Sequence, residues 1–305
     1  MSDPHAGAGR VLARFGRRYI VALDQPGTLP AEADAVPRGR RLEVVTGDRV
    51  DCSRERELLV IESIQPRRNL LYRSDASHTK PLAANVDQLA IVFAPQPPPQ
   101  KEFVWRALLA ARSADIAPLA VLNKTDLADA ATRALLDEVA AWDVPVLRLS
   151  ARTEPQAARA ALAQRCEGRV TLFVGQSGMG KSTLLNLLVD AEVRTGALSR
   201  RGSHGRQTTT ATRWFDFGPQ GALIDSPGFH EFGLAHLAPD QLIRWMPEFA
   251  AVQAPCRFAD CRHFEEPGCA VRAAVEDGRI ARERYAFYRK LWEEEAAQRK
   301  VSRGF

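Results

Sequence analysis

Residues 175–182 read GQSGMGKS and have the glycine, lysine and serine spacing of a phosphate-binding loop. An apolar run (170–174) precedes them and a helical run (183–190) follows, which is the strand–loop–helix setting that this motif needs. Glycines let backbone N–H groups surround phosphate oxygens, while Lys181 would reach the β- and γ-phosphates and Ser182 would ligate Mg²⁺. The alternative is a glycine-rich turn with a surface lysine. The residues predicted to contact phosphate are Gly175, Gln176, Ser177, Gly178, Met179, Gly180, Lys181, Ser182 and Thr183.

The sequence Asn-Lys-Thr-Asp (123–126) directly follows the apolar run 118–122, so it should lie at the carboxyl end of a strand, where open α/β sheets bind ligands. Its aspartate can accept two hydrogen bonds from guanine, whereas adenine would leave that buried carboxylate unpaired. Its asparagine would brace the loop, and the stem of its lysine would cover the base. A Ser-Ala pair after the apolar run 144–149 would flank the guanine. The residues predicted to contact the base are Asn123, Lys124, Asp126, Ser150 and Ala151.

A third motif, Asp-Ser-Pro-Gly, ends the apolar run 221–224 and has the D-x-x-G form that senses a γ-phosphate. Asp225 would hold Mg²⁺ through water, and the Gly228 amide would meet the γ-phosphate. Between the phosphate loop and this motif, residues 193–215 contain five arginines, no acidic residue and three consecutive threonines. We take Thr209 as the threonine that closes over Mg²⁺ and acts in catalysis, with its two neighbours as alternatives. An ordinary flexible loop is the other interpretation of the stretch.

These motifs occur in the order base loop, Ser-Ala, phosphate loop, threonines and D-x-x-G, which is the usual GTPase set cyclically rotated. The rotation predicts a circularly permuted GTPase domain, because the same strands can keep their neighbours while the termini move to another surface gap. In this permuted order the GTPase domain ends just after D-x-x-G, and the C-terminal part follows directly. A movement of the γ-phosphate sensor could therefore pull on the C-terminal part through a short covalent link.

The C-terminal part contains three cysteines and a histidine with the spacing C-x₄-C-x-H-x₅-C. Three thiolates and one imidazole complete a tetrahedral Zn²⁺ site with no open position, so we predict a structural zinc ion. Reduced, unligated cysteines are the alternative. The predicted ligands are Cys256, Cys261, His263 and Cys269, whereas Cys52 and Cys166 are expected to be ordinary buried residues.

The elements that must position these residues fall into three parts, which we place at 1–75, 76–238 and 239–305. Short β-rich runs separated by Gly, Pro and Asp in the first part indicate a five-stranded OB-fold barrel, with an SH3-like barrel as the alternative. Arginines beside tyrosines there suggest an RNA-binding face. In the second part, apolar runs alternate with helical stretches, which is typical of a parallel α/β sheet. The third part should be helical and bind zinc.

Composition limits the classes of protein that remain possible. The chain of 305 residues has a formal charge of +5, which is compatible with a polyanionic partner. No apolar run approaches the length of a membrane span, and the N-terminus does not resemble a signal peptide. We therefore expect a cytoplasmic monomer without membrane contact. Five cysteines in such a chain argue against a disulfide framework.

Taken together, these motifs closely resemble the bacterial ribosome small-subunit-dependent GTPase A family (RsgA) over nearly the whole chain. The resemblance implies an OB-fold, a permuted GTPase domain and a zinc domain that bind GTP or GDP and act on the 30S subunit and its 16S rRNA late in assembly. It also implies slow GTP hydrolysis that the 30S particle stimulates. The segments that carry it are 83–88, 123–126, 175–186, 208–210, 225–228, 231–234 and the cysteine cluster with its EPGC.

One departure from the family concerns the attacking water. The family usually has histidine directly before its threonine triplet, and this chain has Gln207 there. Glutamine can orient water without acting as a base, so Gln207 is our candidate catalytic residue, against a solvent-facing loop residue. His230 and His204 are weaker candidates, and Phe229 stands where Ras-like enzymes carry their water-orienting glutamine.

Two other functions remain compatible with the sequence. One is a GTPase whose partner is a different RNA or a protein. The other is a GTP-sensing binding protein with negligible hydrolysis, in which the two departures around the attacking water reflect loss of catalysis. Measurement of GTP turnover with and without 30S subunits separates the three functions.

Overall fold

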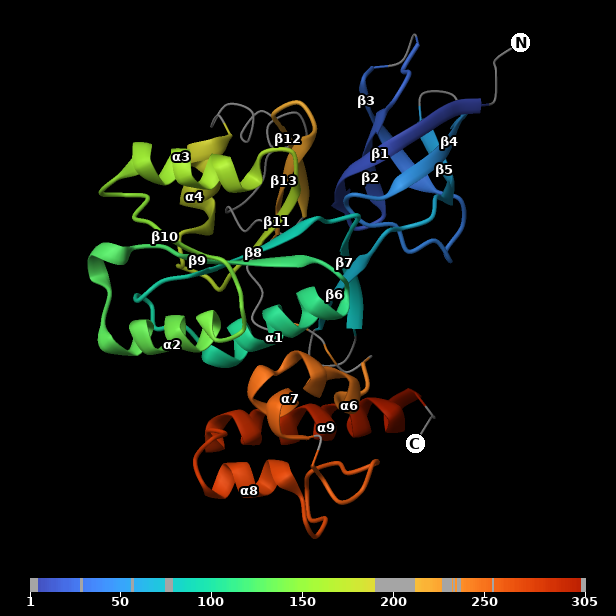
Figure 1. The fold of residues 1–305 in the computed structure, drawn as a ribbon. Helices are drawn as coiled ribbons and strands as arrows, with labels where there is room; N and C mark the ends of the chain where they lie inside the picture. The colour runs from blue at the N-terminus through green and yellow to red at the C-terminus, as the bar shows by residue number, and fades with distance from the viewer. Residues whose placement is uncertain are drawn as a thin grey trace.

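The structure is a computed structural model in which a barrel, a central sheet with helices and a helical C-terminal part follow one another along the chain (Figure 1). The residues that it describes are 5–27, 30–55, 58–74, 79–189, 212–226, 232, 234, 237–253 and 255–302.

The N-terminal part is a closed barrel of five strands. β1 pairs with both β2 and β4, β2 pairs with β3, and a parallel β3–β5 pair together with β4–β5 completes the ring. Apolar residues fill its interior, including Val11, Val21 and Ile61. This arrangement is the five-stranded OB-fold that the sequence predicted. The strands are β1 (His5–Phe15), β2 (Arg18–Leu23), β3 (Glu32–Pro37), β4 (Arg49–Glu55) and β5 (Leu58–Ile64).

A two-stranded hairpin connects the barrel to the central sheet. β6 (Leu70–Ser74) pairs antiparallel with β7 (Thr79–Ala84), and the Nδ2 of Asn85, just after β7, donates to the Gly47 carbonyl of the barrel at 3.0 Å. The predicted boundary after residue 75 falls between these two strands. The division into domains stays a prediction.

The central sheet has five parallel strands and one antiparallel strand in the order β10-β9-β8-β11-β13-β12. The five parallel strands coincide with the apolar runs that the sequence indicated, so the predicted α/β fold is confirmed. We did not predict β12, because its first three residues belong to the arginine-rich stretch 193–215, which we interpreted as the segment that closes over Mg²⁺. The strands are β8 (Gln88–Phe93), β9 (Ala117–Leu122), β10 (Val146–Arg148), β11 (Val170–Val174), β12 (Arg213–Phe217) and β13 (Gly221–Asp225).

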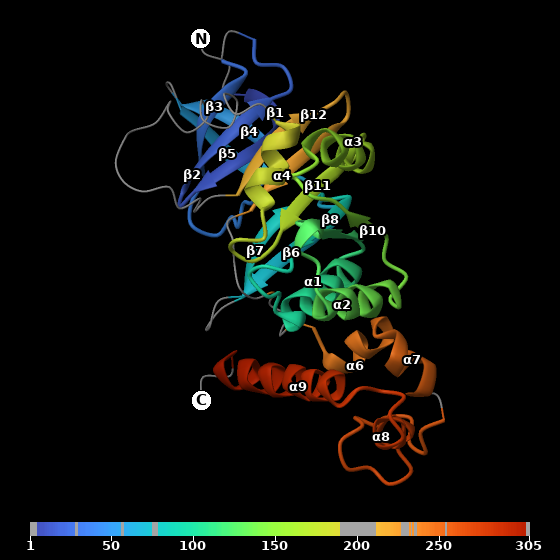
Figure 2. The same cartoon turned by 90° about the vertical axis from the view of Figure 1, so that its left-hand side faces the viewer.

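Helices cover both faces of this sheet, and strand order reverses between its two central strands. α1 (Lys101–Ser113) and α2 (Ala130–Ala140) pack on one face, and α3 (Pro155–Cys166) and α4 (Lys181–Leu188) on the other (Figures 1 and 2). From β8 the chain continues outward to β9 and β10, and it then returns to β11 on the opposite side of β8. The ligand site of an open α/β sheet lies at such a reversal.

The C-terminal part is helical and lies beneath α1 and α2 (Figures 1 and 2). Its apolar residues, such as Met246 and Phe249, belong to the same buried cluster as the α1 face of the sheet, so the two parts share one core. None of the helices in the described residues is long and apolar enough to cross a membrane. The elements are α6 (Pro239–Leu242), a 3₁₀ turn (Ile243–Trp245), α7 (Pro247–Gln253), α8 (Ala270–Glu276) and α9 (Arg282–Ser302).

Candidate functional site

The phosphate-loop sequence lies between β11 and α4, at the reversal of strand order. Two of its glycines lie too close to neighbouring segments to accommodate a side chain. A Cβ on Gly175 would lie 2.6 Å from the Val92 carbonyl oxygen, and one on Gly180 would lie 2.2 Å from the amide nitrogen of Asn123. Gly180 also has a φ of +87°, a conformation that favours glycine. The loop therefore packs directly against the ends of the neighbouring strand and the base loop.

Lys181 begins α4 and reaches across to the end of β13. Its Nζ lies 2.7 Å from Asp225 Oδ1 and also donates to the Ser226 carbonyl oxygen. All three residues are buried, and the Ser226 hydroxyl donates to the Phe173 carbonyl of β11 at 2.7 Å. The structure thus brings together the lysine and the aspartate to which we assigned the γ-phosphate and Mg²⁺.

Asn123 ties together three segments that are far apart in the sequence. Its Nδ2 donates to the Met179 carbonyl of the phosphate loop at 3.1 Å, and its Oδ1 accepts from the Ala151 amide at 3.1 Å. The side chain is 2% exposed, so both contacts are shielded from water. The asparagine braces the loop as its position in the motif predicted.

The remaining residues of the base loop are held in place from both sides. Lys124 has a left-handed backbone with a φ of 57°, and its Nζ donates to Gln96 and Gly178 carbonyl oxygens at 2.6 and 2.8 Å. The Ser150 hydroxyl donates to a carboxylate oxygen of Asp126, which is exposed. The aspartate and the Ser-Ala segment therefore lie together, as a shared base site requires.

Residues 94–100, which we call the Pro-rich loop, form part of this site and were missed in the sequence. Besides Gln96, this loop supplies the Gln100 amide, which donates to the Gln176 Oε1 of the phosphate loop at 3.0 Å. A Cβ on Gly178 would lie 3.0 Å from the Pro97 ring. The position of this loop in the sequence could have indicated its role, because it follows the first strand of the parallel sheet and must lie at the carboxyl edge of that sheet.

Several predicted site residues lie outside the described residues. The structure gives no position for the D-x-x-G glycine, the threonine triplet or the catalytic candidates that surround it. These are Gly228, Thr208, Thr209, Thr210, Gln207, His204, Phe229 and His230.

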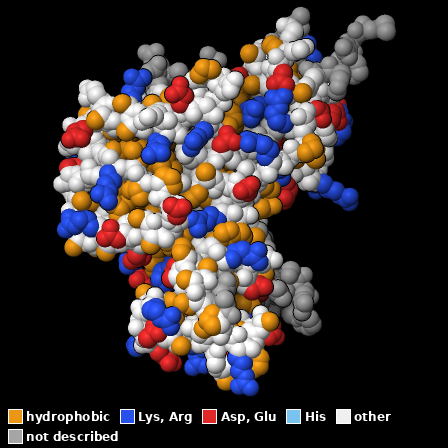
Figure 3. All heavy atoms as spheres, viewed as in Figure 1, with side chains coloured by type: hydrophobic (Ala, Val, Ile, Leu, Met, Phe, Trp, Pro, Cys, Tyr) orange, Lys and Arg blue, Asp and Glu red, His pale blue; other side chains and the backbone are white. Residues whose placement is uncertain are grey.

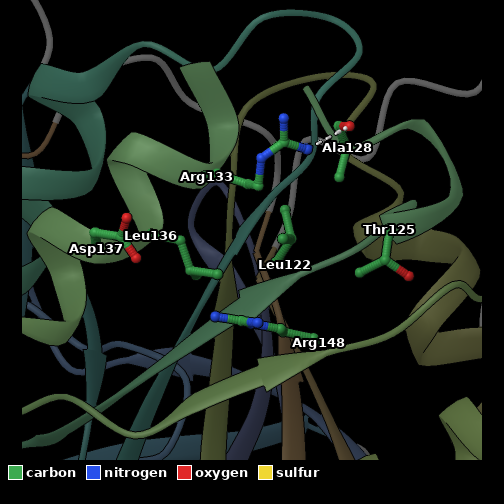
Figure 4. A pocket seen from close by; sticks show the side chains of 7 residues that line it. All are labelled: Leu122, Thr125, Ala128, Arg133, Leu136, Asp137 and Arg148. Atoms are coloured by element: carbon green, nitrogen blue, oxygen red, sulfur yellow. Dashed lines mark hydrogen bonds between the residues drawn. The ribbon is translucent and has the colours of Figure 1, made fainter. Parts of the chain in front are cut away.

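A pocket of about 390 Å³ opens beside the base loop, on the side of α2 and the edge strand β10 (Figure 4). Leu122 and Leu136 contribute apolar surface, and Arg133 donates to the Ala128 carbonyl at 3.1 Å. The pocket does not include the residues assigned to guanine or phosphate, so it lies beside the nucleotide site and is not the site itself. The other lining residues are Thr125, Asp137 and Arg148.

The predicted zinc ligands gather into one cluster between α7 and α8 of the C-terminal part. One ligand atom from each of the four residues lies within 4.8 Å of the others, so the cluster could hold a metal ion. The His263 Nδ1 lies 3.4 Å from Cys269 Sγ and 3.6 Å from Cys256 Sγ. Burial lowers the pKa of His263, which favours the neutral imidazole that metals bind.

Two of the arginines that suggested an RNA-binding face form ion pairs within the protein. Arg67 pairs with the fully buried Asp48 inside the barrel, Arg68 pairs with Asp87, and Tyr19 is 3% exposed within the barrel core. In the view of Figure 3, Lys and Arg side chains are interspersed with Asp and Glu instead of gathering in one patch. Arg67 and Arg68 therefore form ion pairs within the protein, and an RNA-binding face stays a prediction.

Comparison with known proteins agrees with this site and fold. Residues 64–235 match the family described as RsgA GTPase. The chain is 48% identical to "Small ribosomal subunit biogenesis GTPase RsgA" of Paraburkholderia phytofirmans, covering 93% of this chain and 92% of that protein. The protein of the same name from Burkholderia pseudomallei is also 48% identical, with 93% and 90% covered.

Two solved structures share the fold over most of the chain. YjeQ from Thermotoga maritima has a TM-score of 0.67 at 27% identity and covers 95% of this chain and 98% of that one. YloQ, titled a circularly permuted GTPase, has a TM-score of 0.64 at 22% identity, with 96% of each chain covered.

The fold and the order of the motifs around the sheet define a circularly permuted P-loop GTPase with an N-terminal OB-fold and a C-terminal metal-site region. The match over most of the chain makes the assignment more specific. The chain belongs to the RsgA GTPase family.

Proposed function

We propose that this protein is a GTPase that acts in late maturation of the 30S ribosomal subunit and is stimulated by that particle. The observation that carries the proposal is Asn123, which ties the base loop to the phosphate loop and to Ala151 in a chain of the RsgA GTPase family. Relatives 48% identical over most of the chain are named small ribosomal subunit biogenesis GTPases, which supports the choice of partner.

In this proposal the described loops bind GTP or GDP with Mg²⁺. Asp126 reads the guanine, Lys181 contacts the β- and γ-phosphates, and Ser182 ligates Mg²⁺. The buried position of Lys181 beside Asp225 supports these roles, because both groups lie where phosphate and metal would meet. Thr209 completes the Mg²⁺ site, and Gln207 orients the attacking water.

The metal of the C-terminal cluster is proposed to be Zn²⁺. Three thiols and one imidazole within 4.8 Å fit a closed tetrahedral site, and sulfur and nitrogen ligands favour zinc over Mg²⁺ or Ca²⁺. The ion would be structural, since four protein ligands leave no position for substrate.

The partner surface is proposed to include 16S rRNA, bound by a monomer in the cytoplasm. The net charge of +5 and the OB-fold, a common fold for nucleic-acid binding, support an RNA partner.

Sedimentation of the purified protein with 30S subunits tests this function. We expect co-sedimentation with 30S subunits and a non-hydrolysable GTP analogue, and none with purified 50S subunits. The same protein with GDP should sediment less, because the γ-phosphate contacts are missing. Equal binding to 30S and 50S subunits, or to neither, would contradict the proposed partner.

A further inference from the structure

Helix α1 contacts the nucleotide loops at its N-terminal end. The Gln100 amide, directly before α1, donates to Gln176 Oε1 of the phosphate loop, and the Lys124 Nζ of the base loop donates to the Gln96 carbonyl in the same connection. Gln176 is 8% exposed, so water competes little for this hydrogen bond. A shift of α1 along its axis must therefore displace the phosphate loop or break these bonds.

The first half of α1 also carries three ion pairs to the C-terminal helix α9. Lys290 Nζ lies 2.7 Å from Glu102, and both terminal nitrogens of Arg106 donate to Glu294, at 2.9 and 2.5 Å. Each partner in the second pair is four residues beyond its counterpart in the first, so the two helices run in the same direction here. Their third ion pair joins Lys101 and Glu283 at 3.2 Å.

A buried aromatic and cationic contact fixes the register of these helices. Trp105 of α1 packs against Phe287 of α9, with ring centroids 5.3 Å apart. The guanidinium of Arg284 lies over the Trp105 ring at 4.3 Å and over Trp142 at 4.7 Å, and its Nε donates to Glu248 at 2.7 Å. Arg284 is 6% exposed, so the rings and Glu248, and not water, stabilise its buried positive charge.

We propose that α9 positions the phosphate loop through α1, so that nucleotide binding and packing of the C-terminal part are energetically coupled. Gln176, Arg106 and Glu294 are the positioning residues of this connection. The inference rests on the proposed function in one respect, namely that the phosphate loop binds guanine nucleotide. It differs from the covalent link that follows Asp225, because it runs through side-chain contacts between α1 and α9 and not through the chain itself.

Coupling of this kind is reciprocal. If the α1–α9 contacts strengthen nucleotide binding, bound nucleotide must stabilise those contacts by the same free energy. The C-terminal part could then report the nucleotide state to a partner, and a partner that moves α9 could alter nucleotide affinity.

The first test compares two neighbouring substitutions on α9. Glu294→Gln removes the charge that pairs with Arg106, whereas Glu293→Gln makes the same change on an exposed residue one position away. In the full-length protein we expect Glu294→Gln to weaken GDP binding about threefold to tenfold, which lies within the usual range of allosteric coupling. Glu293→Gln should leave the GDP dissociation constant unchanged. Equal dissociation constants for the two variants would overturn the proposal.

A second substitution distinguishes this route from a general loss of stability. Gln176→Met keeps the shape of the side chain but removes the acceptor for the Gln100 amide. In that background Glu294→Gln should have little further effect on GDP affinity, because the connection is already broken. Fully additive effects would mean that α9 acts on the nucleotide by another route.

Hydrogen exchange on the unmodified protein tests the reciprocal effect. Addition of GDP should slow amide exchange in α9, and the same addition to Gln176→Met should not. An α9 whose exchange does not respond to GDP in the parent protein would overturn the inference. A parent protein that binds no GDP at all would instead contradict the proposed function.

Discussion

Asp126 is the residue on which the choice of nucleotide depends. Its carboxylate accepts a hydrogen bond from Ser150, and Asn123 fixes the loop that presents it. A carboxylate can accept from two guanine donors at once, whereas an amide must present a donor of its own.

We therefore predict that Asp126→Asn shifts preference from guanine to xanthine nucleotides. The amide would place a donor opposite a guanine donor, and xanthine offers a carbonyl oxygen there instead. Competition binding with GDP, xanthosine diphosphate and ADP measures the change, which should be about 100-fold or more against GDP. Unchanged GDP affinity would remove Asp126 from base recognition.

Gln207 is the residue that we propose to orient the attacking water during GTP hydrolysis. Gln207→Ala should lower the 30S-stimulated turnover of GTP about tenfold or more and leave GDP affinity nearly unchanged, because a water-orienting group acts in the transition state. Single-turnover hydrolysis and equilibrium binding, measured on the same preparation, separate the two effects. If the stimulated rate does not fall, His230 becomes the residue to test.

At the scale of elements, the connection between barrel and hairpin depends on a buried ion pair. Asp48 is fully buried and accepts from the Val45 amide and from two nitrogens of Arg67, at 2.8, 2.7 and 2.8 Å. The neighbouring pair between Arg68 and Asp87 is largely exposed on the arginine side. The two adjacent arginines thus differ both in their own burial and in that of their partners.

Arg67→Met should lower the free energy of unfolding by about 3 kcal/mol, since it leaves the Asp48 carboxylate buried without its cation. Arg68→Met is the matched control and should cost less than about 1 kcal/mol, because its pair is screened by solvent. Urea unfolding followed by circular dichroism gives both values. Similar losses of unfolding free energy in the two variants would show that the burial of Asp48 does not determine the contribution of its ion pair to stability.

The elements also show what sequence could and could not reveal. Contiguous motifs such as 175–182 carry their own chemistry, so the loops and the five parallel strands were predictable. The contact between Gln100 and Gln176 joins residues 76 positions apart, and nothing in either local sequence marks the other. The partners of Arg67 and Arg68 were hidden for the same reason, and the RNA-binding face that these arginines suggested stays a prediction.

At the scale of the whole molecule, the C-terminal part shares its buried core with the GTPase sheet, and cysteines of the metal cluster pack against that core. Cys269 belongs both to the cluster and to the core. Loss of the metal should therefore destabilise the shared core as well as the cluster.

We predict about one Zn²⁺ per chain and its loss in Cys261→Ser, with a lowered melting temperature for the full-length protein. Cys52→Ala, which removes a buried cysteine outside the cluster, should retain the metal. Elemental analysis and thermal unfolding of both variants provide the measurements. Purified protein free of zinc, with unchanged folding, would contradict the assignment of the metal.

The central claim is that this chain hydrolyses GTP in response to the small ribosomal subunit, and steady-state GTP turnover with and without purified 30S subunits tests it most directly. We expect slow turnover alone and an increase of about 10-fold or more with 30S subunits, no such increase with 50S subunits, and loss of the stimulated activity in Lys181→Ala. A rate that 30S subunits do not change, or a stimulated rate that Lys181→Ala retains, would contradict the account.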